Sequence, residues 1–319
     1  MKAGQLTGYR TVEVVDVPDP TFGSDEALVR INFISVCGSD MRYFSRALPE
    51  NQYPLSPGQP NHECIGVIED GGSGSFKKGD RVIVFPDNND GLKQFLVAPA
   101  DRMILIPDWG KLEHWLMCQH VGTVLYSCKR MGSVVGQNIV ILGQGGIGLA
   151  FTRFLKQMGA LKVIAVDYLD NRLDFARTLG ADATVNCNDP QFLDAIKECT
   201  DGVGPDIVVE AAGTEESVNQ GIAIAKRMGK LIHFGQMKDN VIQYDFATAF
   251  DKNLDCIFTA SSRAGLMKWA VTQSVAMVEK GSLDLGPLVT HQLPFSDLQK
   301  AYDMFTDRQD DIMKVVVST

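Results

Sequence analysis

The sequence predicts an α/β protein in which a doubly wound parallel sheet stands beside a barrel-like β domain. From Gln137 to residue 264, short apolar runs alternate with segments of helix length, as in a parallel sheet that is covered on both faces. A glycine-rich turn joins the first of these runs to a helical pattern. The first 115 or so residues hold short β patterns separated by Gly, Pro, Ser and Asp turns, which is typical of an antiparallel region.

Size and composition point to a globular protein. A chain of 319 residues favours two domains at roughly 100–200 residues each. The chain is 45% hydrophobic and 22% charged, which excludes a disordered or fibrous protein. Its net charge of −9 and its lack of a basic run argue against nucleic acid or an anionic membrane as a partner. No apolar stretch has the length of a membrane span.

Cysteine content and the amino-terminal sequence indicate the compartment. The seven cysteines are an odd number in a long chain, so we expect free thiols or metal ligands rather than a disulfide framework. The first 20 residues lack the apolar core of a signal peptide. We therefore expect a cytoplasmic protein.

The β domain is expected to contain both ends of the chain. Early strand patterns lie at Val12–Val17, Ala27–Val36, Ile65–Glu69 and Arg81–Phe85. The strand-like pattern gives way to a helical pattern at Lys111–Met131. Strand-like sequence returns at Leu288–Leu293 and Lys314–Ser318. We therefore assign residues 1–117 and 265–319 to the β domain and residues 118–264 to the α/β domain.

The α/β domain is predicted as six strands with helices between them. The expected strands are Asn138–Leu142, Lys162–Val166, Ala183–Asn186, Asp206–Glu210, Lys230–Phe234 and Leu254–Thr259. The expected helices are Ile147–Met158, Asp170–Leu179, Gln191–Cys199 and Glu215–Met228, followed by a long helix at Gly265–Lys280.

The glycine-rich turn has the pattern of a dinucleotide site. The sequence GQGGIG at 143–148 follows an apolar strand and opens a helix, the context that this motif requires. Gly143 would allow the tight turn, Gly145 would let the backbone approach a pyrophosphate, and Gly148 would let the helix pack closely. The alternative is a purely structural turn.

Further residues complete the expected nucleotide site. Gly146 and Ile147 stand in the first helical turn, where free N–H groups and the positive dipole end attract phosphates. Asp167 ends the second strand about 20 residues further on; a carboxylate there accepts from the ribose hydroxyls and repels a 2′-phosphate, which favours NAD over NADP. Arg172 is a candidate to lie near the adenine, with a solvated helix residue as the alternative.

Three residues form a candidate metal site. Cys37 follows a strand pattern, His62 follows a proline-rich turn, and Cys118 lies before the glycine-rich turn. Two thiolates and an imidazole suit a catalytic Zn²⁺ with an open position. Such a metal lowers the pKa of a bound water or alcohol to roughly 7. Spacing alone leaves open the alternative that these cysteines are small buried apolar residues.

At this point the chain resembles a zinc-dependent medium-chain dehydrogenase/reductase of the alcohol and polyol dehydrogenase type, over essentially its whole length. The motifs that carry the resemblance are CGSD at 37–40, HE at 62–63, GDRV at 79–82, GQGGIG at 143–148, Asp167, GAD at 180–182, EAAG at 210–213 and KVVV at 314–317. The resemblance implies a GroES-like β-barrel catalytic domain around a Rossmann domain.

The resemblance also implies roles for individual residues. Cys37, His62 and a third residue would hold one catalytic zinc ion, with Glu63 next to the metal or in place of its water. Ser39 would pass on the substrate proton, and Asp40 would orient a ligand, as carboxylates commonly do for zinc-bound histidine. We therefore class Ser39, Asp40 and Glu63 as catalytic.

Three departures from the family pattern stand out. The segment 86–99 contains no cysteine, so the lobe that normally holds a structural zinc is deleted and a second metal is not expected. Asn61 stands where glycine is usual; asparagine tolerates a positive φ. Arg42 stands where alcohol dehydrogenases often place a relay histidine. Because arginine does not release its proton, the proton would leave Ser39 through a ribose hydroxyl or water.

The third zinc ligand is ambiguous. Alcohol dehydrogenases use a cysteine, which spacing places at Cys118, whereas polyol dehydrogenases use a glutamate, which spacing places at Gln119. Because an amide is a poor zinc ligand, we expect Cys118, with Glu63 and a zinc-poor variant as the alternatives. His120 lies beside this segment, and we expect a structural role for it.

The resemblance implies NAD- and zinc-dependent oxidation of a small secondary alcohol or polyol to a ketone. Ala212 and Gly213 of the EAAG motif would contact the cofactor. The alternatives are a zinc-free reductase of the same superfamily and a non-catalytic nucleotide-binding regulatory protein. The family further implies a homodimer or homotetramer that pairs through the sixth strand, Leu254–Thr259.

Overall fold

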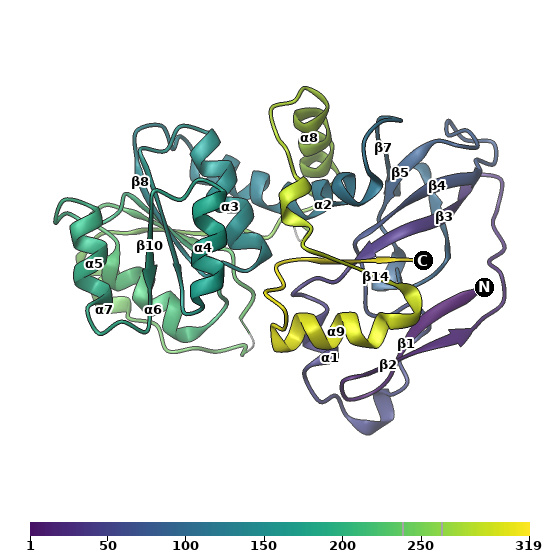
Figure 1. Ribbon diagram of the computed structural model, residues 1–319, viewed down its shortest axis with the longest axis horizontal. Helices are drawn as coiled ribbons and strands as arrows, with labels where there is room; N and C mark the ends of the chain where they lie inside the picture. The colour runs from purple at the N-terminus through teal and green to yellow at the C-terminus, as the bar shows by residue number, and fades with distance from the viewer. Residues whose placement is uncertain (238, 263) are drawn as a thin grey trace. The chain divides into compact units, whose positions relative to one another are not determined.

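The computed structural model describes residues 1–237, 239–262 and 264–319 (Figure 1). The chain divides into two compact units, one made of residues 1–122 and 268–319 and the other of residues 123–267. The two ends of the chain therefore build one unit together. Among the described residues, no helix combines the length and apolar character that a membrane span requires.

The unit of residues 123–267 is built on a six-stranded sheet in the order β10-β9-β8-β11-β12-β13. All its neighbours are parallel, and the order is that of a doubly wound dinucleotide-binding sheet. The predicted fold class is confirmed in this unit. Its strands are β8 (Asn138–Leu142), β9 (Lys162–Asp167), β10 (Ala183–Asn186), β11 (Ile207–Glu210), β12 (Lys230–His233) and β13 (Asp255–Phe258).

Helices cover both faces of this sheet. On one face α3 and α4 contact each other, and on the other α6 contacts both α5 and α7 (Figure 1). Val140 and Leu142 pack with Phe192 and Val218 in one core cluster, and the alternate residues of β8 are equally buried. Burial on both faces explains why the strands read as continuous apolar runs. The helices are α3 (Gly146–Gln157), α4 (Asp170–Thr178), α5 (Phe192–Cys199), α6 (Glu215–Ile224) and α7 (Phe246–Asp251).

The other unit is built on a seven-stranded sheet in the order β14-β15-β3-β4-β5-β7, with β6 also paired to β3. The carboxy-terminal strand β15 pairs antiparallel with β3, so the two ends of the chain share this sheet. A separate antiparallel pair is formed by β1 and β2. The strands are β1 (Lys2–Gly8), β2 (Thr11–Asp16), β3 (Glu26–Ser35), β4 (Cys64–Asp70), β5 (Arg81–Val84), β6 (Phe95–Pro99), β7 (Met103–Leu105), β14 (His291–Pro294) and β15 (Val315–Ser318).

One helix in this unit differs from the expected β-like tail. Residues 298–307 form α9, which contacts β2, β14 and β15 (Figure 1). Its buried residues Leu298, Ala301 and Tyr302 recur at helical spacing, so the segment is an amphipathic helix. The other helices outside the parallel sheet are α1 (Met41–Phe44), α2 (Leu112–Met131) and α8 (Met267–Glu279), with single 3₁₀ turns at Glu50–Gln52, Asp87–Asn89, Ala100–Arg102, Gly286–Leu288 and Phe295–Asp297.

Candidate active site

The ends of three neighbouring strands bring chemically active side chains to one edge of the seven-stranded sheet. β3 ends shortly before Cys37, β4 begins directly after Glu63, and β15 begins directly after Lys314. Because β4 and β15 both run antiparallel to β3, the end of β3 lies beside the starts of the other two. The sheet register therefore places these three residues together.

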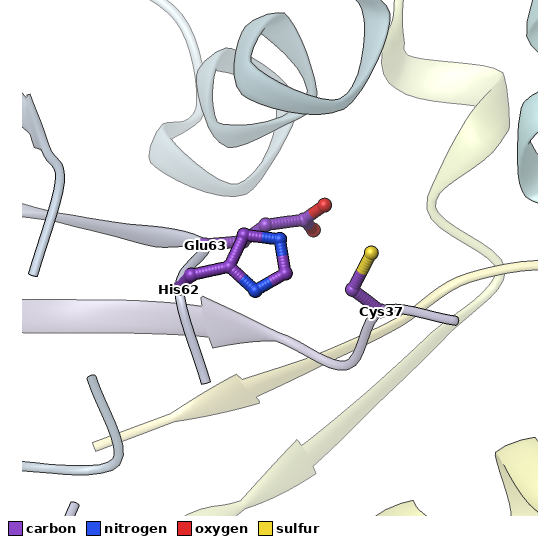
Figure 2. A group of neighbouring side chains, drawn as sticks. All are labelled: Cys37, His62 and Glu63. Atoms are coloured by element: carbon purple, nitrogen blue, oxygen red, sulfur yellow. The ribbon is translucent and has the colours of Figure 1, made fainter. Parts of the chain in front are cut away.

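Cys37, His62 and Glu63 form a compact group of potential metal ligands. Their ligand atoms all lie within 4.8 Å of one another, and Figure 2 shows the three side chains directed toward a common point. A thiolate, an imidazole and a carboxylate are donors that Zn²⁺ accepts. The donor set fits one catalytic zinc ion.

Asp40 and Ser39 surround the imidazole of His62. Asp40 Oδ1 lies 3.1 Å from His62 Nδ1, and its other oxygen accepts the N–H of Cys37 at 3.0 Å. This contact orients His62 so that Nε2 faces the cluster, as an outer carboxylate does for a ligating histidine. Ser39 Oγ lies 3.4 Å from both His62 Nε2 and Cys37 Sγ. The hydroxyl expected to carry the proton thus lies against the cluster.

The surroundings of Cys37 favour the thiolate. Burial and the charge of Glu63 raise its pKa, but the charge of Lys314 and hydrogen bonds with His120 and His62 outweigh them and lower it to about 6. A thiolate is the form that binds metal. The pKa of His62 is raised well above its usual value, because Asp40 and Cys37 overcome the effect of burial. Metal binding would therefore release a proton from the imidazole.

Lys314 is the buried counter-ion of Glu63. Its Nζ lies 2.6 Å from Glu63 Oε2 and donates to the carbonyl of Val36 at 2.9 Å. Ser35 Oγ donates to the same carboxylate oxygen. Burial raises the pKa of Glu63, but Lys314 and His120 oppose it and hold the pKa well below the usual range. The carboxylate is therefore charged although it is buried.

The structure does not bring Cys118 into the metal group. In an α-helix, side chains two positions apart in the sequence point in directions that differ by about 200°. Cys118 and His120 therefore lie on opposite faces of α2. His120 Nδ1 lies 3.5 Å from Glu63 Oε1, whereas Cys118 faces Ser274 of α8 and burial raises its pKa to about 12. The residue of α2 that faces the group is therefore His120 and not the expected Cys118. The neighbouring Gln119 donates its amide to the carbonyl of His62, so it supports the ligand segment.

Asn61 differs from the expectation of a positive φ. The φ of Asn61 is not positive. Its side-chain amide donates to the carbonyl of Ser35 at 2.8 Å. Its N–H donates to Asn89 O at 2.8 Å, and its carbonyl accepts from Gly91 at 3.0 Å. The short loop that stands in place of the structural-zinc lobe is thus bonded directly to the residue before His62.

In the turn at residues 143–148, each glycine is needed for a different structural reason. Gly143 has a φ of +91°, and a Cβ on Gly148 would lie 1.8 Å from the carbonyl oxygen of Gly143. Both positions therefore require glycine for the turn itself. A Cβ on Gly145 would meet only Arg172, at 3.8 Å. Since the protein does not crowd Gly145, its missing side chain leaves room for a ligand, which fits a dinucleotide.

Asp167 lies beside the glycine-rich turn. One carboxylate oxygen accepts the N–H of Gln144 at 2.6 Å and the other that of Leu169 at 3.0 Å. Arg172 lies 3.8 Å from the same carboxylate. A carboxylate has about four lone-pair sites, so Asp167 retains acceptor capacity for ribose hydroxyls.

The EAAG motif lies next to this turn. A Cβ on Gly143 would lie 3.0 Å from atoms of Ala212. The N–H groups of Ala212 and Gly213 both donate to Glu210 Oε1, at 2.8 and 2.7 Å. Burial raises the pKa of Glu210 in spite of these bonds. The two predicted contact residues are therefore fixed beside the glycine-rich turn.

Comparison with known proteins decides the family. The alcohol dehydrogenase GroES-like domain family matches residues 23–108, and the zinc-binding dehydrogenase family matches residues 146–273. The chain belongs to the zinc-dependent medium-chain dehydrogenases. It is 28% identical to an alcohol dehydrogenase of Cupriavidus necator, covering 99% of this chain and 98% of that one, and 27% identical to a sorbitol dehydrogenase of Bacillus subtilis, covering 99% and 97%.

Solved structures of this dehydrogenase family share the fold. An alcohol dehydrogenase from Thermus sp. superposes with a TM-score of 0.89 at 21% identity, covering 100% of both chains. The predicted combination of a GroES-like domain and a Rossmann sheet is thereby confirmed. The protein is an oxidoreductase that acts on the CH–OH group of small-molecule alcohols.

Sequence analysis expected only a structural role for His120 and assigned no role to Lys314. His120 contacts both Cys37 and Glu63, and Lys314 forms the ion pair with Glu63. Lys314 carried a signal, because it is the one charged residue in the apolar run IMKVVV at 312–317. A lysine in a buried strand needs a partner of opposite charge.

Proposed function

We propose that this dehydrogenase oxidises a secondary alcohol or polyol to a ketone with one zinc ion and NAD. The observation that carries the proposal is the Cys37–His62–Glu63 group with Ser39 Oγ against it. A bound zinc ion supplies Lewis acidity that favours loss of the proton from an alcohol. The relatives named sorbitol dehydrogenase and D-xylulose reductase support a polyol as substrate.

The residues of the site have distinct tasks in this mechanism. Cys37, His62 and Glu63 would hold the ion, and His120 lies next to Glu63. Asp40 keeps the imidazole of His62 in one orientation. Ser39 takes the proton from the substrate hydroxyl and passes it to water or to a ribose hydroxyl, because the guanidinium of Arg42 stays protonated at working pH and cannot accept the proton.

Asp167 supports NAD as the cofactor. Gly143, Gly145 and Gly148 shape the turn that receives the pyrophosphate, and the carboxylate of Asp167 stands at the end of β9. Its negative charge would face a 2′-phosphate in a partly dry pocket, which disfavours NADP. A zinc-binding dehydrogenase of Sinorhizobium meliloti with the same fold was solved with NADP, so the discrimination must come from such local residues.

The edge of the parallel sheet supports a homodimer. β13 is the last strand in the sheet order, and its residues are mostly exposed, with Phe258 at 69%. An apolar edge strand with unpaired backbone groups pairs readily with a second strand. We therefore propose pairing of β13 with its copy in a second chain. We also propose that the enzyme works in the cytoplasm.

A substrate screen with metal analysis tests the function. NADH formation should be followed across sugars, polyols, hydroxy acids and amino alcohols, with zinc content measured on the same preparation. The proposal expects turnover of at least one alcohol and one zinc ion per chain. Turnover without zinc would replace the mechanism with that of a zinc-free reductase. NAD binding without turnover across the panel would instead favour a regulatory protein.

A further inference from the structure

A cavity opens beside the loop that carries the metal ligand Cys37. It has a volume of about 370 Å³ and is lined by Arg42, Tyr43, Arg46 and Gln52 with three apolar residues of the same segment. Pockets that hold small molecules begin at about this size. The proposed chemistry uses Ser39 and Asp40 immediately before this segment, but it gives no task to the cavity.

The two arginines of the cavity lack acidic partners. Within the described parts of the chain, neither the Arg42 side chain nor the Arg46 side chain forms an ion pair or a hydrogen bond. The chain as a whole carries a net charge of −9, and the cavity lining contains no acidic residue. Two unpaired guanidinium groups in one recess of an acidic protein create a local attraction for anions.

Arg42 is held in place by an aromatic ring. Its guanidinium carbon lies 4.9 Å from the centroid of Tyr43, and Tyr43 packs against the core of the β unit. Stacking of this kind leaves the N–H groups along the edge of the guanidinium free to donate. The edge of an arginine matches the paired oxygens of a phosphate or a carboxylate.

The lining of the cavity begins at Arg42, three residues after Ser39. Three residues of chain span at most about 11 Å, so the backbone of Arg42 cannot be further than that from the backbone of Ser39. The short helix α1 (Met41–Phe44) continues directly from Asp40. The cavity lining therefore begins close in the chain to the proposed proton acceptor.

We propose that Arg42 and Arg46 form an anion subsite that binds the phosphate or carboxylate group of the alcohol substrate. The inference rests on the proposed dehydrogenase function and narrows its substrate to an anionic polyol: a polyol phosphate or a sugar acid. Gln52 supplies an amide for neighbouring hydroxyl groups.

Direct binding tests the subsite without catalysis. Titration calorimetry with inorganic phosphate and with gluconate should detect binding to the wild-type chain. Arg42→Gln and Arg46→Gln should each weaken that binding about tenfold or more, the scale of one charge-assisted contact. Arg227→Gln is the matched control, because Arg227 is exposed and lies outside the cavity. Equal binding by all four proteins, or no binding by the wild type, would overturn the subsite.

Kinetics then separate the two anion classes. kcat/KM is compared for a hexitol, its phosphate ester and the matching hexonic acid, each with NAD. We expect the phosphate ester or the acid to exceed the neutral hexitol at least tenfold in the wild type, and Arg46→Gln to reduce this ratio about tenfold. Oxidation of neutral hexitols at the same efficiency would refute the subsite and leave the dehydrogenase function intact. Anion binding without any NADH formation would refute the dehydrogenase function alone.

Discussion

Lys314 Nζ lies 2.6 Å from Glu63 Oε2, and both side chains are almost fully buried at one edge of the seven-stranded sheet. The pair joins the last strand of the chain to the segment that supplies two potential zinc ligands. Lys314 also donates to the carbonyl of Val36, next to the third ligand, Cys37. The carboxy-terminal strand therefore fixes both the position and the charge of the site.

Lys314→Met should strongly destabilise the metal-free protein. The substitution leaves the carboxylate of Glu63 buried without its cation, and breaking one partner of such a pair costs about 3–5 kcal/mol. We expect a loss of this size in the free energy of unfolding, measured by urea titration with a chelator present. The double variant Lys314→Met/Glu63→Gln should lose less than the sum of the two single variants, because it removes the uncompensated charge.

Lys78→Met is the matched control for this prediction. Lys78 pairs with Glu69 at 3.5 Å on the surface, with the lysine side chain 77% exposed. Exposed pairs contribute about 0–1 kcal/mol, so this variant should unfold close to the wild type. If Lys314→Met were no less stable than Lys78→Met, the buried pair would have no structural importance.

Cys37→Ser and Cys118→Ser should differ completely in zinc content. Cys37 lies in the group of ligand atoms that approach within 4.8 Å, whereas Cys118 faces away from it on α2. We expect Cys37→Ser to lose both zinc and activity, and Cys118→Ser to keep one zinc ion per chain with most of its activity. Elemental analysis after exhaustive dialysis measures the content.

The opposite result would restore the expectation drawn from spacing. Loss of zinc from Cys118→Ser with normal unfolding would mean that α2 turns its other face to the metal when the ion is bound. Two zinc ions per chain would contradict the loss of the structural-zinc lobe. Retention of zinc by Cys37→Ser would exclude the proposed centre.

Ser39→Ala should keep the metal and lose turnover. Ser39 Oγ lies 3.4 Å from His62 Nε2, close to the metal group without belonging to it. Loss of a proton-transfer group lowers kcat by about 10²–10⁴. Steady-state kinetics and zinc analysis on the same sample measure both effects, with the exposed Ser296→Ala as control. Unchanged kcat would show that the proton leaves by another route.

The parallel sheet could be predicted well and the β unit only in part, for a physical reason. Burial on both faces makes strands such as Asn138–Leu142 continuous apolar runs, and these are easy to recognise. In the β unit, strands β1, β6 and β7 were not predicted, because β1 (KAGQLTG) mixes polar and apolar residues and β6 (FLVAP) and β7 (MIL) are short. Helix α9 was not predicted, because it begins only a few residues after the strand-like segment Leu288–Leu293 and was grouped with it.

The metal site shows a different limit of sequence analysis. Cys37, His62 and Glu63 were predicted from the CGSD and HE motifs that carry the family resemblance, and the structure places their ligand atoms within 4.8 Å of one another. The contribution of α2 depended on the rotation of a helix, which residue spacing does not specify. His120 and Lys314 meet Glu63 only through the tertiary fold, although a lysine in an apolar run was a usable signal.

The enzyme should sediment as a dimer or a larger assembly at micromolar concentration. Phe258 lies on the edge strand β13 and is 69% exposed. A lysine at such an edge opposes strand pairing, so Phe258→Lys should shift the mass toward that of one chain, 34.9 kDa. Leu193→Lys on α5, which contacts β10 at the other edge of the sheet, is the control. A wild-type monomer would contradict the proposed pairing.

Asp167→Asn should relax the preference for NAD mainly by improving the use of NADP. The wild type is expected to discriminate by two or more orders of magnitude, because two like charges in a partly dry pocket cost a few kcal/mol. Asp167 accepts the N–H groups of Gln144 and Leu169 with its two different oxygens. Asparagine removes the charge and keeps one acceptor oxygen, so it retains only one of these two contacts. Asp167→Ala removes those acceptors as well, so it should additionally lower stability and weaken NAD binding. The kcat/KM for each cofactor measures the change in preference, and thermal unfolding measures the change in stability. Comparable kcat/KM for NAD and NADP in the wild type would assign the discrimination to a residue other than Asp167.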